Sequence, residues 1–570
     1  MRKGTYVLII FLVFFFLFLA TIISFIYYEF AKPPSIKAHS YLEINLSGEI
    51  MERTAPDFLF TLFAGRKPLT MYNLWMNIRK AKMDARVDSL LIHLSYLQCG
   101  WAKINELREA ILDFKKSGKK VYAYVEEGFE FDKEYYLATA CDKVILHPLG
   151  SLNINGIGGY FPFLKKALAE LGIAAEFEHV EEYKTAANIF TEKGFTPAHK
   201  EMMVSLYGDL FSQYVKTIAQ ARGKSENKIK ELIDQGFFYG EKALNEGLID
   251  ELLFPDQIEN LLKENKKRIN KISFEQYSRV KPSSLGLNKG KKIALIYGSG
   301  PIYTGVSYYQ TIGSKTVAHW IRRASRDNSI AAVVFRVDSP GGSAVASDVI
   351  WREVVLAKNE KPFIVSMSDV AGSGGYWISM AAHEIVVHPQ TLTGSIGVVA
   401  GKFDMSGLYE KLGITSERLT FGKRADIFSS FRGFTQEERK LLKDQILWIY
   451  KQFLKKVAEG RNMTEDEVDK IGKGRVWTGN QAKELGLVDK IGSLSTAIAI
   501  AKERSGIPAE EEVRLVIWPK KISFLKALFG RKETKSGLNL DSRLERIISI
   551  IKFLERDNVW ALMPIWIEPE

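Results

Sequence analysis

Two glycine-rich segments of this chain stand where a strand is predicted to end and a helix to begin. Residues 338–343 read Asp-Ser-Pro-Gly-Gly-Ser, and residues 371–376 read Ala-Gly-Ser-Gly-Gly-Tyr. Glycines let the backbone turn and leave N–H groups free to bind an anion or an oxyanion. Ser373 in the second segment has the small neighbours that a nucleophile needs, although a Gly-Gly pair at such a junction is more often only a tight turn.

A serine hydroxyl also needs a general base. His383 is predicted on the same helix as Ser373, with its side chain nearly three turns away, and His388 has a counterpart in the first half of the chain, which indicates a structural role. A Ser-His-Asp triad is therefore unsupported. A lysine can act as the base where burial lowers the pKa of its amine, and Lys184 and Lys423 are the two candidates.

An internal duplication relates these two lysines. The segment that ends at His147 reappears ending at His388, an offset of 388 − 147 = 241, and the lysines are offset by 423 − 184 = 239. A nearly constant offset indicates tandem copies of a domain of roughly 230 residues. At this offset Ser373 corresponds to Asp132, and both glycine-rich segments occur in the second copy alone. We infer that an active site exists in one copy and has decayed in the other.

Within the second copy, strands and helices are predicted to alternate. Strands are expected at 330–337, 362–367 and 384–388, with a helix at 344–356 and another beginning near Gly374. This alternation is typical of βαβ units and a parallel sheet, so the fold class is α/β with tandem domains. The predicted limits are 40–277 for the first repeat, 278–292 for a polar linker, 293–515 for the second repeat and 516–570 for a basic amphipathic extension with helices at 523–531 and 544–554.

In combination the motifs resemble the long, duplicated form of the signal peptide peptidase A family. The resemblance rests on both glycine-rich segments, on Thr-Gly-Ser-Ile-Gly at 393–397, on Tyr-Lys-Thr-Ala around Lys184 and on Gly-Arg-Val-Trp-Thr-Gly near Gly474. It implies a ClpP/crotonase-like fold and a Ser-Lys dyad whose serine comes from the second copy and whose lysine comes from the first. Ser373 is then the nucleophile and Lys184 the base.

The same resemblance implies the supporting groups of the site. Ser395 would orient the lysine, and the backbone N–H groups of Gly341 or Gly342 and of Gly374 would form the oxyanion hole. In the short form of the family the lysine lies in the same repeat as the serine. Lys423 matches that position and stays a rival base.

The N-terminus is predicted to anchor the chain in a membrane. Tyr6 to Tyr28 are 23 consecutive uncharged residues, which as a helix of about 1.5 Å per residue span a hydrocarbon core of about 30 Å. Arg2 and Lys3 precede them and favour a cytoplasmic N-terminus. We expect residues 1–30 to form an uncleaved single-pass anchor in the inner membrane, with the catalytic domains on the periplasmic side. A cleaved signal peptide is the alternative.

Composition narrows the possible partners. The 570 residues carry a net charge of +12, but no zinc-knuckle spacing or long Lys/Arg block points to nucleic acid. No histidine pair has metal-ligand spacing, so neither a metal nor a cofactor is expected. Cys99 and Cys141 are expected to be free thiols rather than one bridge.

The prediction is a membrane-anchored serine endopeptidase that degrades cleaved signal peptides and related membrane-proximal peptides. The family resemblance implies a homotetramer, since paired domains would complete sites between neighbours. The alternatives are a crotonase-type acyl-CoA enzyme and an inactive membrane scaffold. Periplasmic exposure argues against the first, and intact Ser373, Lys184 and glycine-rich segments argue against the second.

Overall fold

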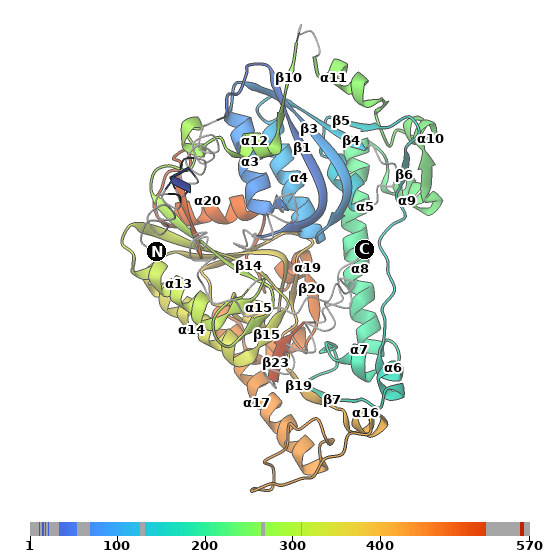
Figure 1. Cartoon of the computed structure of the whole chain (residues 1–570), viewed down its shortest axis with the longest axis vertical. Helices are drawn as coiled ribbons and strands as arrows, with labels where there is room; N and C mark the ends of the chain where they lie inside the picture. Colours follow the sequence, from blue (N-terminus) through green and yellow to red (C-terminus); the bar gives the residue numbers. More distant parts are fainter. Residues whose placement is uncertain are drawn as a thin grey trace.

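A computed structural model of the chain contains two α/β units joined side by side (Figure 1). It describes Phe11, Phe14, Phe15, Leu17, Phe18 and Thr21 and residues 34–53, 69–125, 132–263, 268–308, 310–519 and 559–563. Within these residues no helix is both long enough and apolar enough to cross a bilayer. Most of the predicted anchor, Tyr6 to Tyr28, and the helices predicted at 523–531 and 544–554 lie outside the described residues.

The first repeat is built on a parallel sheet with the strand order β10-β1-β3-β4-β5-β9. Its strands are β1 (Ser40–Met51), β3 (Val87–Gln98), β4 (Lys120–Val125), β5 (Lys143–Leu146), β9 (Glu251–Leu252) and β10 (Asn270–Ser273). Strands β3 and β4 are apolar along most of their length, as expected for strands covered on both faces. The helices α3 (Met71–Met83) and α4 (Trp101–Lys115) are the crossovers that follow β1 and β3.

The second repeat copies this order as β22-β11-β14-β16-β17-β21, again parallel. Its strands are β11 (Lys292–Ser299), β14 (Ile330–Ser339), β16 (Phe363–Gly372), β17 (Glu384–Val387), β21 (Lys490–Ile491) and β22 (Arg514–Trp518). The α/β class and the tandem duplication are therefore confirmed. The predicted strands and the helix α14 (Ala344–Glu360) are confirmed as well.

One local prediction is wrong. The helix that begins at Gly374 is the single turn α15 (Gly374–Trp377), so His383 is not on it. The helix ends at Trp377, and residues 378–383 form tight turns. The His383 imidazole accepts a hydrogen bond from the Phe363 N–H (3.1 Å). His383 is thus tied to the start of β16.

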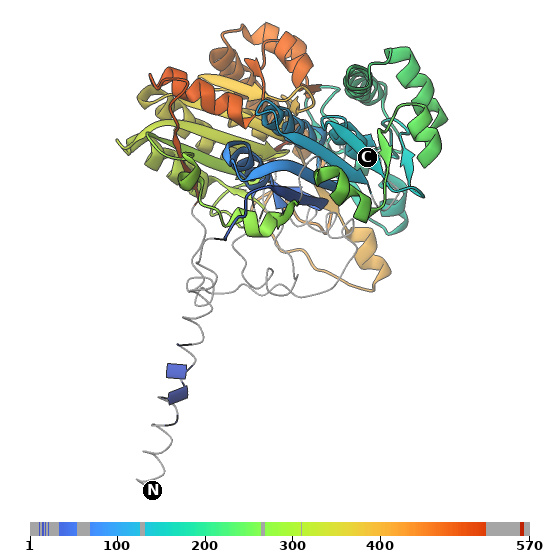
Figure 2. The ribbon, with the colours of Figure 1, turned by 90° about the horizontal axis from the view of Figure 1, so that it is seen from above.

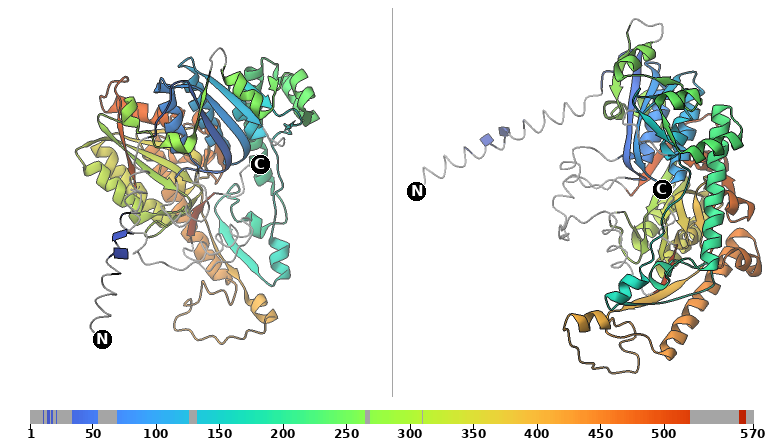
Figure 3. Two further views of the ribbon diagram at one scale, coloured as in Figure 1. Left: turned by 45° about the horizontal axis from the view of Figure 1, so that its top comes forward. Right: turned by 90° about the vertical axis from the view of Figure 1, so that its right-hand side faces the viewer.

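Residues 165–222 of the first repeat form an arm that reaches across to the second repeat (Figure 1). Its strand β7 (Ala174–His179) pairs antiparallel with β19 (Val399–Asp404) of the second repeat over six residue pairs. The arm returns along the helix α8 (Pro197–Arg222), which runs past both units in Figure 3. The apolar residues of its first half pack beside Val476 of the second repeat, whereas those of its second half belong to the core of the first.

The end of the chain also joins this junction. Strand β23 (Val559–Leu562) lies between β15 (Gly341–Ser343) and β19 and is antiparallel to both. Figure 2 shows from above how the two main sheets lie beside each other, with helices of both repeats between them. One face of β11 packs against Trp75 and Met76 of α3 and against α20 (Leu494–Arg504), a helix of the second repeat.

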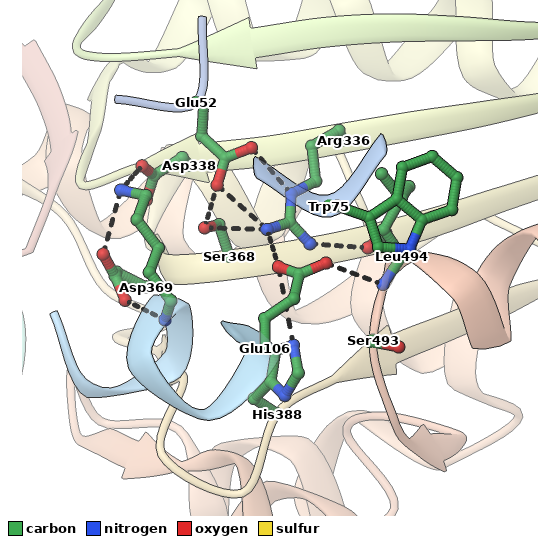
Figure 4. A network of polar contacts seen from close by, with 12 residues as sticks. Glu52, Trp75, Glu106, Arg336, Asp338, Ser368, Asp369, His388, Ser493 and Leu494 are labelled. Carbon is green, nitrogen blue, oxygen red and sulfur yellow. Dashed lines mark hydrogen bonds and ion pairs between the residues drawn. The ribbon is translucent and has the colours of Figure 1, made fainter. Parts of the chain in front are cut away.

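A buried ionic network connects the two repeats (Figure 4). Arg336 on β14 is fully buried and donates to both carboxylate oxygens of Glu52 at 2.9 Å, and it also contacts Glu106 of α4. Burial opposes ionisation of Glu106, but the guanidinium of Arg336 outweighs it and holds the pKa of that carboxyl below its ordinary value. Both carboxylates belong to the first repeat and the arginine belongs to the second.

The loss of Arg336 should therefore destabilise the whole molecule. Arg336→Ala leaves Glu52 and Glu106 as buried charges without their cation, and we expect it to lower the free energy of unfolding by about 3–5 kcal/mol. The measurement is urea unfolding followed by circular dichroism. Arg504→Ala is the control, because its ion pair with Glu384 is part-exposed, and it should cost less than about 1 kcal/mol. Equal effects of the two substitutions would show that the network does not hold the repeats together.

Candidate active site

Ser373 stands at the turn between β16 and α15 in a backbone conformation that is unusual for a serine. Its φ is 54° and its ψ is −110°, which for a residue with a Cβ is a strained conformation. Two hydrogen bonds maintain it, since the Ser373 N–H donates to the Gly394 carbonyl (2.7 Å) and the Ser373 carbonyl accepts from the Trp377 N–H (2.8 Å). The turn thus directs the side chain of Ser373 towards the junction of the repeats.

Lys184 of the first repeat meets Ser373 at this junction. Its Nζ lies 2.7 Å from Ser373 Oγ, 3.0 Å from Ser395 Oγ and 2.9 Å from the Ser395 carbonyl oxygen. All three side chains are completely buried. The structure therefore brings together the predicted nucleophile, base and orienting serine, from two repeats and three separate segments.

The environment of Lys184 favours a neutral amine. Burial lowers the pKa of Lys184 well below its ordinary value of 10.5, and no carboxylate among the described residues opposes that shift. The two oxygens of Ser395 accept hydrogen bonds from Nζ, so the lone pair of a neutral amine is available to the hydroxyl of Ser373. This is the arrangement in which an amine can remove a proton from a serine.

A loop of the second repeat fixes the backbone of Lys184. The Tyr183 N–H donates to the Lys473 carbonyl (3.1 Å), and the Gly474 N–H donates to the Ile396 carbonyl (2.8 Å). Gly474 has a φ of +81°, and a Cβ on it would lie 2.5 Å from the backbone nitrogen of Lys184. Only glycine fits there, which explains the glycine at this point of the predicted motif.

The segment 338–343 lies next to the turn that contains Ser373. Gly341 and Gly342 have φ values of 99° and 153°, conformations that favour glycine. The Gly341 N–H donates to Ser339 Oγ (3.2 Å), and that hydroxyl donates to the Gly300 carbonyl (2.7 Å). A Cβ on Gly341 would lie 2.7 Å from the backbone nitrogen of Gly374, so the two glycine-rich segments meet beside Ser373.

The first repeat supports both glycine-rich segments through the N-terminus of α4. The carboxylate of Asp369, just before the second segment, accepts from the N–H groups of Gly100 and Lys103, each at 2.9 Å. The amine of Lys103 lies 2.7 Å from Asp338, at the start of the first segment, and 2.9 Å from Asp369. Sequence reasoning missed these residues. The only signal was that residues 98–101 are the counterpart of a glycine-rich segment and still contain Gly100.

Burial and mutual attraction together set the protonation states of Lys103, Asp338 and Asp369. Burial alone would lower the pKa of Lys103, but Asp338 and Asp369 together raise it well above its ordinary value. Burial likewise raises the pKa of Asp338, to about 6, whereas for Asp369 the Lys103 ammonium overcomes burial and the pKa is lowered. At neutral pH the helix N-terminus is therefore joined to the second repeat by a protonated lysine and an ionised aspartate.

The other candidates lie elsewhere. The Lys423 side chain is 72% exposed and forms an ion pair with Glu437 at 2.7 Å, so within this chain it is not beside Ser373. His388 is buried next to Glu106, consistent with a structural role. Asp132, the counterpart of Ser373, accepts hydrogen bonds from the Tyr214 hydroxyl (2.6 Å) and from two backbone N–H groups. In the first repeat the position of the nucleophile is thus occupied by a structural carboxylate.

No group of side chains suited to a metal ion occurs among the described residues. Cys99 and Cys141 are both free, as predicted, and burial raises the pKa of the Cys141 thiol to about 12, so this thiol is not activated.

Comparison with known proteins identifies one family of peptidases. The model of the family described as "Peptidase family S49" matches residues 113–269 and 356–507, one segment in each repeat. "Serine protease SPPA, chloroplastic" of Arabidopsis thaliana is 35% identical over 500 residues, which are 85% of this chain and 72% of that protein. "Protease 4" of Salmonella typhi is 32% identical over 76% of this chain and 72% of its own length. "Putative signal peptide peptidase SppA" of Enterococcus faecium is 36% identical over 32% of this chain and 54% of its own length.

The burial of Lys184 generates a prediction about stability and pH. Because its folded pKa is lowered, the unfolded chain binds more protons than the folded one from that pKa up to 10.5, and stability rises with pH across this window. Lys184→Met removes the cost of burying the amine. We expect it to raise the free energy of unfolding near neutral pH by about 1 kcal/mol, with the gain shrinking towards pH 10.5.

Urea unfolding of the wild type and of Lys184→Met between pH 6 and pH 10 measures this difference. Lys423→Met is the matched control, because that side chain is exposed, and it should leave stability unchanged at each pH. A difference between Lys184→Met and wild type that does not vary with pH would contradict a lowered pKa for Lys184.

Proposed function

Since the chain belongs to peptidase family S49 and is a serine peptidase, we propose that Ser373 and Lys184 are its catalytic dyad. The observation that carries the proposal is the contact of 2.7 Å between Lys184 Nζ and Ser373 Oγ in a fully buried setting. Geometry supports Lys184 over Lys423, whose amine is exposed and paired with Glu437.

In this mechanism the neutral Lys184 removes the proton of Ser373 as the hydroxyl oxygen attacks a peptide carbonyl carbon. The N–H groups of Gly342 and Gly374 stabilise the resulting oxyanion. Gly342 is favoured over Gly341 as the first donor because the Gly341 N–H already donates to Ser339 Oγ. The ammonium of Lys184 then gives its proton to the leaving amine, and the acyl group stays on Ser373.

Water completes the reaction. Lys184, neutral again, removes a proton from a water molecule that attacks the acyl carbon, and Ser373 recovers its proton as the ester breaks. The two oxygens of Ser395 keep Nζ directed at the reacting serine throughout both steps. The fixed backbone around Gly474 prevents the lysine from withdrawing.

We further propose that the substrates are cleaved signal peptides and related membrane-proximal peptides. The similarity to "Putative signal peptide peptidase SppA" of Enterococcus faecium supports this class of substrate. The apolar run from Tyr6 to Tyr28 supports a single-pass anchor in the inner membrane, with the peptidase on the periplasmic side. Such an anchor would hold the site close to peptides that leave the bilayer.

A homotetramer is part of the same proposal. The strands β7 and β19 pair at the junction inside the chain. Their counterparts at the repeat offset are residues 413–418 and 158–163, which form no strand and are mostly exposed. Exposed apolar side chains accompany them, namely Tyr160, Leu412, Ile414 and Leu419. These outer segments could pair between neighbouring copies as β7 and β19 do within one, and repetition of that contact would close a ring.

Substitution of the dyad tests the mechanism. We expect Ser373→Ala and Lys184→Ala to lower kcat/KM for a fluorogenic peptide at least about 1,000-fold, because each removes a group that the reaction needs. Lys423→Ala should stay within about twofold of the wild type. Hydrolysis that persists in Ser373→Ala would overturn the assignment of the nucleophile, and loss of activity in Lys423→Ala alone would move the base.

The position of Lys184 can be tested through Gly474. Gly474→Ala places a Cβ against the backbone of Lys184 and should lower kcat about 10- to 100-fold by displacing the amine. Gly118→Ala is the matched control, because Gly118 also has a positive φ (+80°) but nothing lies within 4 Å of its Cβ position. Both substitutions strain the backbone to a similar degree, so an equal loss of kcat in the two variants would contradict a positional role for Gly474.

A further inference from the structure

Strand β16 is irregular just before it reaches Ser373. Two regular pairs with the parallel strand β14 flank the irregularity, namely Val337 opposite Met367 and Ser339 opposite Ala371. Between them, Asp338 alone faces the three residues 368–370 of β16. Such bulges bend a strand and are common beside active sites, where they redirect a side chain. This bulge ends three residues before Ser373, so its shape sets the direction in which the serine turn leaves the sheet.

Each of the three bulge residues is held by a polar contact of its own. Ser368 Oγ accepts a hydrogen bond from the guanidinium of Arg336 (3.1 Å). The Asp369 carboxylate accepts from two backbone N–H groups at the start of α4. The Val370 N–H donates to the Asp338 carboxylate (3.1 Å), at the point where the pairing of the strands is interrupted. The conformation of the bulge therefore depends on side chains and on the first repeat.

The first repeat reaches the bulge with the part that corresponds to the oxyanion-binding segment of the second. Gly100 is the counterpart of Gly341 at the repeat offset, since 341 − 100 = 241. The N–H groups of Gly100 and Lys103 each donate to the Asp369 carboxylate at 2.9 Å. A helix N-terminus attracts negative charge, and here it binds a permanent anion of the other repeat. The remnant of one oxyanion site thus serves as a support for the other.

The amine of Lys103 joins the bulge to the first glycine-rich segment. It is buried and lies 2.7 Å from the carboxylate of Asp338 and 2.9 Å from that of Asp369. One of these carboxylates precedes Gly341 by three residues, and the other precedes Ser373 by four. A displacement of this single amine would therefore move the nucleophile and the oxyanion donors relative to each other.

We propose that Lys103 is a positioning residue of the peptidase, which holds the bulge through Asp338 and Asp369 and thereby sets the orientation of Ser373. The inference rests on the proposed function of Ser373 and deepens it. The first repeat then contributes two amines with different tasks. The neutral amine of Lys184 moves a proton, whereas the ammonium of Lys103 touches no reacting atom and maintains the geometry.

Asp338 makes this support sensitive to pH. The charged groups that face it are Lys103 of α4, Asp369 of the bulge and Glu52 after β1, and Glu52 is itself paired with Arg336. Burial raises the pKa of Asp338 to about 6, Lys103 opposes that shift, and the two other carboxylates add to it. As the pH falls through about 6, Asp338 takes up a proton and no longer attracts the ammonium. We expect the bulge to loosen in that range.

Kinetics with a fluorogenic peptide measure this effect. The ratio of kcat/KM of the wild type to that of Asp338→Asn should fall about tenfold from pH 7 to pH 5, because the wild-type carboxylate is protonated over that range and the amide is not. The requirement for a neutral Lys184 is common to both proteins and cancels in the ratio.

Glu106→Gln is the matched control for the pH series. Glu106 is buried at the same junction, but Arg336 holds its pKa so low that it stays ionised between pH 5 and pH 7. The ratio of the wild type to this variant should therefore stay constant. A ratio to Asp338→Asn that is also constant would overturn the proposal, since a purely structural ion pair would leave the pH profile unchanged.

A double variant separates positioning from the burial of charge. Lys103→Met alone leaves two buried carboxylates without their cation and destabilises the fold. Lys103→Met combined with Asp338→Asn removes one charge of each sign. We expect kcat about 10- to 100-fold below that of Asp338→Asn, with KM within about threefold. Recovery of kcat to the level of Asp338→Asn would show that only the balance of charge matters and would overturn the proposal.

Hydrogen exchange follows the same contacts without catalysis. Amides of residues 368–377 should exchange at least about tenfold faster in the double variant than in Asp338→Asn, whereas those of β19 should be unchanged. Equal exchange in 368–377 would contradict the positioning of the bulge, whatever the kinetics. Faster exchange there, in a protein whose Ser373→Ala variant still hydrolyses the peptide, would instead support the role of Lys103 in the fold and contradict the proposed function alone.

Discussion

The site depends on the contact between the N-terminus of α4 in the first repeat and Asp369 in the second. Asp369 lies four residues before Ser373 and accepts hydrogen bonds from the N–H groups of Gly100 and Lys103. The amine of Lys103 forms ion pairs with Asp369 and with Asp338, which lies three residues before Gly341. A Cβ on Gly100 would lie 2.4 Å from the carboxyl carbon of Asp369, so the contact needs a glycine. Because helix N–H groups and a buried ammonium meet the carboxylates, one element of the first repeat aligns both glycine-rich segments.

Lys184 comes to this place through a second contact across the same junction. The pairing of β7 with β19 carries the arm over the second repeat, and the loop at Gly474 fixes its backbone. Desolvation then lowers the pKa of the amine, whereas an exposed lysine would be protonated at neutral pH. The network around Arg336 adds a buried ionic contact between the two repeats. Catalytic potential here follows from how closely two copies of one domain pack.

Much of this could be predicted from the sequence. Apolar periodicity and the repeat offset identified the parallel sheets, the duplication and Ser373, because these depend on local patterns. The choice between Lys184 and Lys423 could not be made from such patterns, since the two are equivalent in the repeat and differ only in what covers them. The roles of Gly100 and Lys103 and the strand at Ala561 depend on contacts between distant segments, and the ClpP/crotonase-like description of the repeats stays a prediction. Residues 516–570 were expected to be a basic extension, yet Val559–Leu562 form a strand inside the site.

The geometry also accounts for which copy retained its serine. In the proposed mechanism the base for Ser373 is Lys184, which belongs to the first repeat and lies 2.7 Å from the serine hydroxyl. The lysine that corresponds to Lys184 for the position of Asp132 is Lys423, whose side chain is 72% exposed and paired with Glu437 at 2.7 Å. Without a buried amine, a serine at position 132 would gain no activation. A carboxylate that satisfies Tyr214 and two backbone N–H groups instead strengthens the fold there, so the duplication could lose one site without loss of function.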